Sequence, residues 1–219
     1  MLLTPDNREE WLKARINGIG GSDAGTVLGK NKYKNNVELW QEKTGRLIPK
    51  DISDKPAVIF GKCAEKYLRE LFKLDYPQYT VDYHEFYMYV NDDHPFIFAT
   101  LDGELTDKNG RHGILEIKTT TIQNSNQWSE WGTAEHEPRI PDSYYVQILH
   151  QLAATSWEFA VLTAYIRYYR NGVLRAAVRH YFIERSEVEN DIEWLISKEE
   201  LFWKSVKENK EPALILPEI

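Results

Sequence analysis

The sequence has little cysteine, no long apolar run and no excess of positive charge. Its single Cys among 219 residues excludes an intrachain disulfide framework, a four-Cys zinc site and a Cys-ligated iron–sulfur cluster. No apolar run approaches the roughly 18 residues of a membrane-spanning helix. The first residues also lack the basic and apolar stretches of a secretory signal. We therefore expect a reducing, cytoplasmic compartment and no membrane partner.

The net charge is -7, from 34 acidic and 27 basic residues, so overall charge does not indicate nucleic-acid binding. A local basic groove can still coexist with an acidic exterior, and an acidic surplus can include metal ligands. None of the 6 His residues pairs at the HExxH spacing, which leaves zinc chemistry without support. Hydrophobic residues make up 42% of the chain, enough for a full core.

We expect one domain over residues 1–219, because domains commonly run to about 100–200 residues. The patterns predict a helical part over 1–45, a core of strands and helices over 57–168, and a C-terminal helix over 186–209. This order favours an α/β fold with a central mixed sheet flanked by helices. The predicted elements are three short helices capped by Asp6, Ser22 and Asn36, longer helices over 57–74, 143–155 and 186–209, and strands over 79–90, 94–105, 112–119, 158–168 and 173–183.

The glycine-rich stretch from Gly18 to Gly25 first suggests a phosphate-binding loop. It fails as a dinucleotide fingerprint, because Asp23 stands at the third Gly position, and as a P-loop, because no Lys follows Gly25. What remains is a helix opened by Ser22, whose free N–H groups attract anions, with Arg15 nearby as a bidentate phosphate clamp. The alternative is a tight turn between two helices with a surface Arg.

Three acidic residues and a lysine form a candidate metal site. Glu65 lies on the apolar face of its helix, where a carboxylate needs a metal or a cationic partner. Asp102 ends an apolar strand, and Glu116 and Lys118 share one face of the next strand across a tight turn. This pattern predicts an acid pair for Mg²⁺ or Mn²⁺ and a Lys that orients or deprotonates a water. Singly, Glu65 fits a structural ion pair equally well, and the E-x-K triplet fits an exposed strand face.

A polar stripe of Tyr144, Gln147 and Gln151 follows one face of the helix over 143–155. Amides there can hydrogen-bond to water, to phosphate or to Lys118. The alternative is a stripe exposed to solvent.

The segment over 120–142 is polar and contains Trp128 and Trp131. Long loops of this kind are often functional, and Trp rings can stack on an unpaired base, so we expect a DNA contact here. The alternative is that both Trp side chains fill a gap in the core.

Five short motifs occur in order: WLKARINGIGGSDAG, FGKCAEKYL, ATLDGEL, LEIKTT and YYVQILHQLA, over about residues 8–168. Together they resemble the lambda-exonuclease-like, YqaJ-type phage recombination nucleases of the PD-(D/E)xK superfamily. The resemblance implies a restriction-endonuclease-like αβββαβ core with an N-terminal helical elaboration. It also implies a metal-dependent exonuclease that degrades the 5′-ended strand of duplex DNA and leaves a 3′ overhang for an annealing protein. Leu101 replaces the nominal proline before the Asp, which is a common variation.

The resemblance also assigns the metal site. It makes Asp102, Glu116 and the backbone carbonyl of Ile117 the Mg²⁺ ligands. Glu65 assists the metal directly or through a water, and Lys118 positions the nucleophilic water.

Outside the metal site, the resemblance implies that Gln147 supports Lys118 or the water and that Arg15 and Ser22 bind the 5′-terminal phosphate. It further implies a ring-shaped homotrimer, double-stranded DNA ends as substrate, and a phage or prophage protein in a bacterial cytoplasm.

Three other functions remain open. A structure-selective or restriction-type endonuclease of the same superfamily would use the same constellation, and only the region of Arg15 and Ser22 favours an end-binding enzyme. A non-catalytic nucleic-acid-binding module is disfavoured, because inward acids without a metal repel phosphate. A glycosidase with Glu65 and Glu116 as its acid pair and the Trp-rich loop as a sugar platform is disfavoured by Lys118, which suits phosphoryl chemistry.

Overall fold

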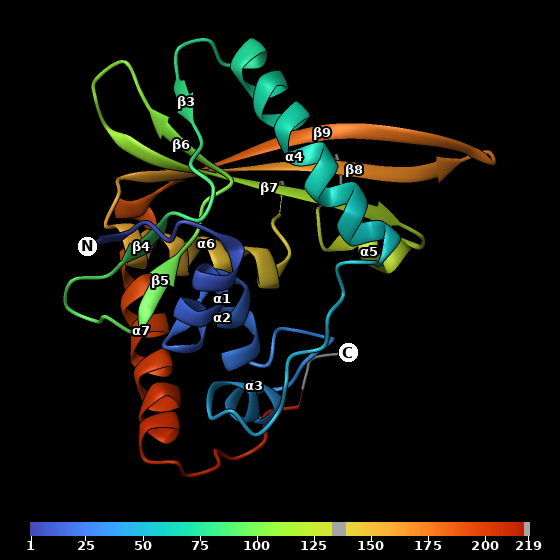
Figure 1. The fold of residues 1–219 in the computed structure, drawn as a ribbon. Coiled ribbons are helices and arrows are strands. Elements are labelled where there is room, and N and C mark those ends of the chain that lie inside the picture. Colours follow the sequence, from blue (N-terminus) through green and yellow to red (C-terminus); the bar gives the residue numbers. More distant parts are fainter. Residues whose placement is uncertain (133–138, 217–219) are drawn as a thin grey trace.

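The computed structural model describes residues 1–132 and 139–216, and Figure 1 shows their arrangement. The strands are β1 (Leu2–Leu3), β2 (Ile19–Gly20), β3 (Thr80–Asp82), β4 (Met88–Val90), β5 (Ile97–Ala99), β6 (Gly103–Thr106), β7 (His112–Ile122), β8 (Phe159–Arg170) and β9 (Val173–Glu184). The helices are α1 (Arg8–Ile16), α2 (Gly21–Val27), α3 (Asn36–Lys43), α4 (Pro56–Asp75), α5 (Ser125–Ser129), α6 (Asp142–Thr155) and α7 (Arg185–Lys207).

The strands form two mixed sheets. The large sheet has five strands in the order β3-β6-β7-β8-β9, in which β7 and β8 are parallel and the other neighbours antiparallel. The small sheet has four strands in the order β1-β4-β5-β2, in which β2 and β5 are parallel. The expected α/β class, with a mixed sheet flanked by helices, is confirmed.

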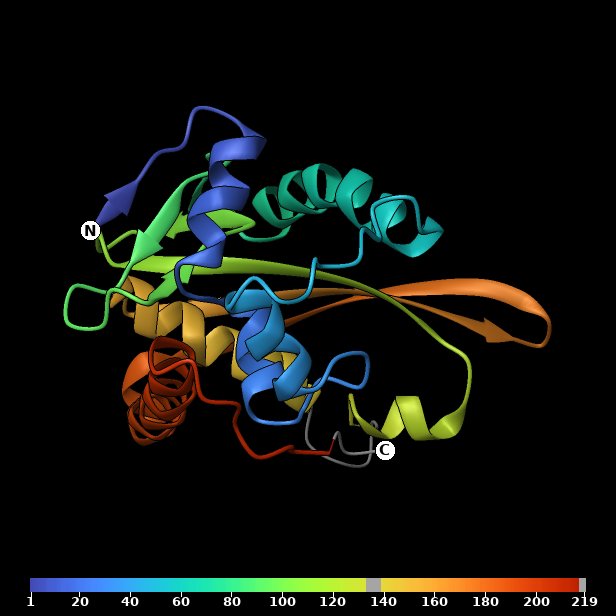
Figure 2. The ribbon, with the colours of Figure 1, turned by 60° about the horizontal axis from the view of Figure 1, so that its bottom comes forward.

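Helices cover both faces of the large sheet, with α4 on one face and α6 on the other (Figures 1 and 2). Side chains alternate along β7, so Leu115 and Ile117 pack with α4 while Ile114 packs with α6. Glu116 and Lys118 lie on the same face of β7 as Ile114. They are therefore directed toward α6, as the strand pattern predicted.

The strands predicted over 79–90 and 94–105 are wrong in extent. The structure divides the first into β3 and β4 and the second into β5 and β6. Strands β3 and β6 join the large sheet, whereas β4 and β5 join the small one. The chain turns sharply between β3 and β4, where Phe86 has a positive φ of 67°. The alternation of apolar and polar residues indicates that a segment is extended, but it does not indicate which sheet the segment joins.

The predicted N-terminal helices are present, but their caps differ from the prediction. Asn7 caps α1 in place of Asp6, and Asn35 caps α3 in place of Asn36. Each accepts a hydrogen bond from a backbone N–H in the first turn. Ser22 lies inside the first turn of α2 instead of capping it. Neighbouring polar residues have similar capping chemistry, so the sequence places such a cap only to within one or two residues.

The long helices over 57–74, 143–155 and 186–209 are confirmed as α4, α6 and α7, with ends shifted by one or two residues. Between the strands predicted over 158–168 and 173–183, Asn171 and Gly172 have the positive φ of a tight hairpin turn. Within residues 1–132 and 139–216, no helix combines the length and the apolar character needed to cross a membrane.

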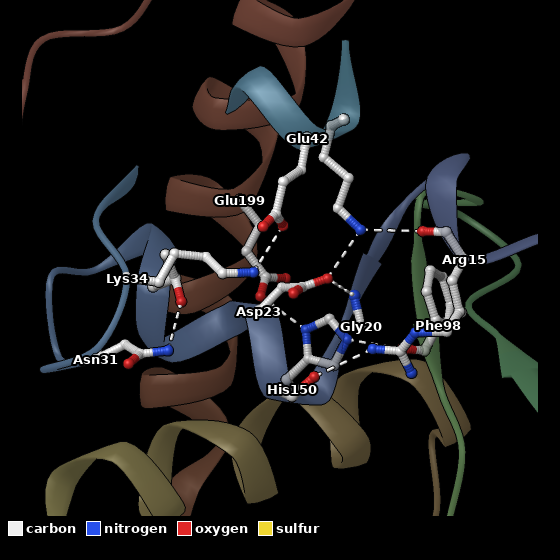
Figure 3. Close-up of polar contacts among 12 residues, drawn as sticks. Arg15, Gly20, Asp23, Asn31, Lys34, Glu42, Phe98, His150 and Glu199 are labelled. Carbon is white, nitrogen blue, oxygen red and sulfur yellow. Dashed lines mark hydrogen bonds and ion pairs between the residues drawn. The ribbon is translucent and has the colours of Figure 1, made fainter. Parts of the chain in front are cut away.

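A buried ion pair joins α6 to α7 (Figure 3). His150 Nδ1 lies 2.7 Å from Glu199 Oε1, and His150 Nε2 lies 2.8 Å from the carbonyl oxygen of Phe98. The carbonyl is an acceptor, and so is Glu199 when ionised; with both as acceptors, both ring nitrogens donate, as in an imidazolium. Burial lowers the pKa of His150, but the Glu199 carboxylate outweighs this and holds that pKa above its usual value.

We expect the free energy of unfolding to fall as pH rises through the folded-state pKa of His150. A group with a raised pKa stabilises the fold fully below its unfolded value, about 6.5 for His, and loses this contribution when it deprotonates. Glu199→Gln should reduce this pH dependence, whereas Glu193→Gln, at an exposed position on the same helix, should retain it. Urea unfolding between about pH 6 and pH 9 compares the three proteins. The same pH dependence in Glu199→Gln would assign it to other groups.

Candidate active site

A cavity of about 160 Å³ brings together residues from distant parts of the chain. It lies beside β7, α4 and α6 and the first turn of α2. Its lining contains all the predicted catalytic and phosphate-binding residues but neither Trp. The lining residues are Arg15, Gly21, Ser22, Glu65, Thr100, Asp102, Glu116, Ile117, Lys118 and Gln147.

Glu116 is the most buried acid of this cavity, with 2% of its surface exposed. Its Oε1 accepts hydrogen bonds from Lys118 Nζ at 2.5 Å and from Gln147 Nε2 at 2.7 Å. Its Oε2 accepts one from Gln151 Nε2 at 2.5 Å. The polar stripe of α6 therefore faces the site, and Gln147 supports Glu116 directly, where we expected it to support Lys118 or the water. Gln151 belongs to the predicted stripe, but the sequence did not indicate a contact with Glu116.

Asp102 stands next to Glu116 across the β6–β7 pair. Its Oδ2 accepts a hydrogen bond from the backbone N–H of Ile117 at 2.8 Å, which fixes the carboxyl group beside β7. Its carbonyl accepts another from Arg69 Nη1 at 2.9 Å. Burial, and then the nearby Glu116, raise the pKa of Asp102 well above its usual value. Two acids so close together call for a cation between or beside them.

Lys118 and Glu65 complete the charged group. Burial lowers the pKa of Lys118, but Glu116 and Asp102 outweigh it, and the pKa stays above its usual value. Lys118 is therefore an ammonium group, which suits the orientation of a water better than its deprotonation. Burial, opposed by Arg69, raises the pKa of Glu65.

This donor set fits a hard divalent cation. Mg²⁺ binds through one or two carboxylates, carbonyl oxygens and several waters, and the lining of the cavity includes Asp102, Glu116 and Ile117. Among the residues that the structure describes, no group of three or more His, Cys, Asp or Glu residues could hold a metal. Asp102 and Glu116 are two carboxylates, a number that suits Mg²⁺, which keeps several waters when a protein binds it.

Arg15 reaches the same cavity from the end of α1. Its Nη2 donates to Ser22 Oγ at 3.1 Å, and its guanidinium carbon lies 4.6 Å from the centre of the Trp11 ring. A Cβ on Gly20 would lie 3.3 Å from Arg15 Nη2 and 3.0 Å from the Phe98 ring, so the glycine leaves room for this packing. The aromatic support and the Ser22 contact hold the guanidinium in place at the cavity wall.

An ion pair that the sequence did not reveal joins α2 to α3, and its lysine also reaches the end of α1. Asp23 Oδ2 lies 2.8 Å from Lys43 Nζ, and Lys43 Nζ also donates to the carbonyl of Arg15 at 2.9 Å. Asp23 further accepts a hydrogen bond from the backbone N–H of Gly20 at 3.2 Å (Figure 3). Burial raises the pKa of Asp23, but Lys43 and Arg15 outweigh it, and the pKa falls below its usual value. Asp23, which stands at the third Gly position and so rules out a dinucleotide fingerprint, thus stabilises the glycine-rich turn between α1 and α2.

The two Trp residues lie away from the cavity. Trp131 is 2% exposed and packs against the rings of Tyr144 and Tyr181, which favours the alternative that it fills the core. Trp128 is half-buried against Tyr168, with the Arg179 guanidinium over its ring. Residues 133–138 of the predicted DNA-contacting segment lie outside the described residues.

The family model of the YqaJ-like viral recombinase domain matches residues 10–158. The chain belongs to this family. The curated uncharacterized protein YqaJ of Bacillus subtilis (strain 168) is 33% identical over 166 residues, which cover 70% of this chain and 44% of YqaJ. The YqaJ-like chain therefore spans less than half the length of that relative.

Solved structures show the same fold. The alkaline exonuclease LHK-Exo from Laribacter hongkongensis superposes with a TM-score of 0.64 at 19% identity, over 92% of this chain and 93% of that chain. A phage related exonuclease from Haemophilus somnus 129PT superposes with a TM-score of 0.56 at 12% identity, over 88% and 96%. The YqaJ-like chain thus has the fold of an alkaline exonuclease, and the resemblance drawn from the five motifs is confirmed for family and fold.

Replacing Lys43 by Met should lower the free energy of unfolding by about 3–5 kcal/mol, because it leaves the Asp23 carboxylate buried without its cation. Lys13→Met is the matched control, since Lys13 forms only an exposed pair with Glu9. The double variant Lys43→Met with Asp23→Asn should recover part of the loss. Urea unfolding measures all four proteins, and a Lys43→Met protein as stable as the control would contradict this role.

Proposed function

We propose that this YqaJ-like domain is a metal-dependent nuclease that degrades the 5′-ended strand of linear duplex DNA in the 5′→3′ direction. The product would be a duplex with 3′ single-stranded overhangs for recombination by strand annealing. One observation carries the proposal: the acid pair with Lys118 and the Arg15–Ser22 contact line the same cavity. The first group suits phosphodiester hydrolysis, and the second suits a terminal phosphate.

In this reaction, Asp102, Glu116 and the Ile117 carbonyl would hold the cation. Bound Mg²⁺, or Mn²⁺ in its place, would activate a water and offset the charge that develops on the phosphate. Lys118 would orient the water through its ammonium group. Gln147 and Gln151 would keep the Glu116 carboxylate fixed during turnover. Glu65, which lines the same cavity, would assist the cation or its water.

Arg15 and Ser22 would bind the 5′-terminal phosphate in the same cavity. A guanidinium offers two parallel donors to a phosphate, and Ser22 adds a hydroxyl. Trp11 and Phe98 hold the Arg15 guanidinium, so little side-chain freedom is left to lose on binding.

Two of the structural neighbours are an alkaline exonuclease and a phage related exonuclease, which supports an exonuclease over an endonuclease. The metal cavity alone would serve a restriction-type or structure-selective endonuclease as well. A sugar-cleaving role is disfavoured, because both Glu116 oxygens are held by donors and Trp131 is buried. We also propose a ring-shaped homotrimer that passes its overhang to a single-strand annealing protein in the bacterial cytoplasm.

The first experiment compares linear and circular duplex DNA, each with Mg²⁺, Mn²⁺ or EDTA. We expect degradation of the linear DNA alone, and only with a divalent cation, because the enzyme starts at an end and its acids need a cation. Glu116→Ala and Lys118→Ala should each abolish degradation while the circular dichroism spectrum stays unchanged. Cutting of circular DNA would favour an endonuclease, and full activity after exhaustive chelation would contradict the metal site.

Arg15→Ala should slow degradation of 5′-phosphorylated ends by about ten- to a hundred-fold, the effect of losing a charge-assisted contact of about 1.5–3 kcal/mol. On 5′-hydroxyl ends the loss should be small, since the phosphate ligand is absent. Initial rates on matched linear duplexes that differ only in that phosphate give the comparison, with Lys13→Ala as control. An equal loss on both ends would mean that Arg15 holds the fold or the DNA in general.

A further inference from the structure

The β8–β9 hairpin projects well beyond the body of the protein (Figures 1 and 2). Its two strands pair along their whole length, from Phe159 opposite Glu184 to Arg170 opposite Val173. The inner half is buried in the large sheet, whereas residues 169–176 are all exposed. We call residues 167–176 the arm.

The hairpin is basic in an acidic protein. Between Phe159 and Ile183 the sequence has four Arg and no Asp or Glu, although the chain as a whole has a net charge of -7. The four are Arg167, Arg170, Arg175 and Arg179. The charged side chains that the hairpin presents to a polyanion are therefore all positive.

Two of these arginines share one face near the tip. Arg170 lies opposite Val173 and Tyr168 lies opposite Arg175, and residues two apart on a strand share a face. Both arginines are exposed. Within the part of the chain that the structure describes, neither side chain forms a hydrogen bond or an ion pair. Their guanidinium groups are thus available to a ligand.

Arg167 lies at the base of the arm, on the opposite face of β8 from Arg170 and Arg175, and beside the active site. It lines a cavity of about 700 Å³ together with Thr119, Thr120 and Thr121 of β7. That cavity shares Gly21, Ser22 and Gln147 with the cavity that contains the acid pair. A continuous set of lining residues therefore leads from the acids to the base of the arm.

We propose that the arm binds the phosphate backbone of duplex DNA outside the active site, without reading its sequence. This inference rests on the proposed function. Guanidinium groups pair with phosphates, and a two-stranded ribbon fits the major groove of B-DNA. A second copy of the chain is the other candidate occupant. The eight exposed residues of the arm fall short of the roughly 20–30 residues that each side of a stable protein interface contributes.

The arm contact affects how tightly DNA is held and leaves hydrolysis itself unchanged. Each phosphate contact adds about 0.9 to the slope of log affinity against log salt concentration. Loss of two contacts, at Arg170 and Arg175, should therefore lower the slope by about 1.8.

The test compares Arg170→Ala/Arg175→Ala with two other double variants of the full chain. Lys207→Ala/Lys210→Ala removes the same charge from exposed positions at the far end of α7, and Arg170→Lys/Arg175→Lys keeps the charge of the arm. Affinity for a blunt-ended duplex of random sequence is measured in EDTA at several KCl concentrations. We expect Arg170→Ala/Arg175→Ala to bind at least ten-fold more weakly at low salt with the smaller slope. The other two should keep the wild-type slope, and all should match wild-type turnover at saturating DNA with Mg²⁺.

Unchanged affinity and slope in Arg170→Ala/Arg175→Ala would overturn the proposal, as would wild-type protein that does not bind duplex DNA. Loss of an oligomer in that variant alone, measured by light scattering, would assign the arm to a contact between copies. Duplex binding that depends on the arm in a wild-type protein without hydrolysis would support the arm and reject the proposed nuclease. If the protein hydrolyses DNA but its DNA binding does not depend on the arm, the result would support the proposed nuclease and overturn the proposed role of the arm.

Discussion

The burial of the Glu116 carboxylate in the middle of the large sheet is the constraint on which the site depends. A buried charge costs several kcal/mol unless donors surround it. One donor, Lys118, comes from the same strand, and two, Gln147 and Gln151, come from successive turns of α6. This requirement sets the position of α6 across β7. Helix α6 then carries His150 to its contacts with α7 and with the small sheet.

The small sheet sets the distance between Arg15 and the acid pair. Strand β5 pairs in parallel with β2, with Ile97 opposite Ile19, so the turn after Arg15 lies beside this strand. Three residues after β5 ends at Ala99, the same chain reaches Asp102. A shift in the β2–β5 register would therefore separate Arg15 from Asp102, even though neither residue belongs to the small sheet. The Asp23–Lys43 pair holds the other side of this turn.

The sequence predicted what depends on local periodicity and could not predict what depends on distant pairing. Alternation in β7 and a tight turn brought Asp102, Glu116 and Lys118 together correctly, and helical spacing placed Gln147 on the correct face. The small sheet escaped prediction, because β1 and β2 are two residues long and show no period. Asp23 was misleading for a related reason. Its partner Lys43 is 20 residues away on another helix, so the sequence showed only an acid in a glycine-rich turn.

The net charge of -7 is compatible with a DNA substrate once the charges are located. The acids of the active site are inside, where Glu116 is covered by donors and Asp102 adjoins it, so they contribute little to the field at the surface. The cations lie where phosphates would come: Arg15 at the cavity wall and Arg170 and Arg175 on the exposed arm. Electrostatic attraction is screened beyond about 10 Å at ordinary salt, so this local arrangement outweighs the charge of the remote surface. Under the proposed function, an acidic exterior would then limit binding to duplex DNA that reaches both the arm and the cavity.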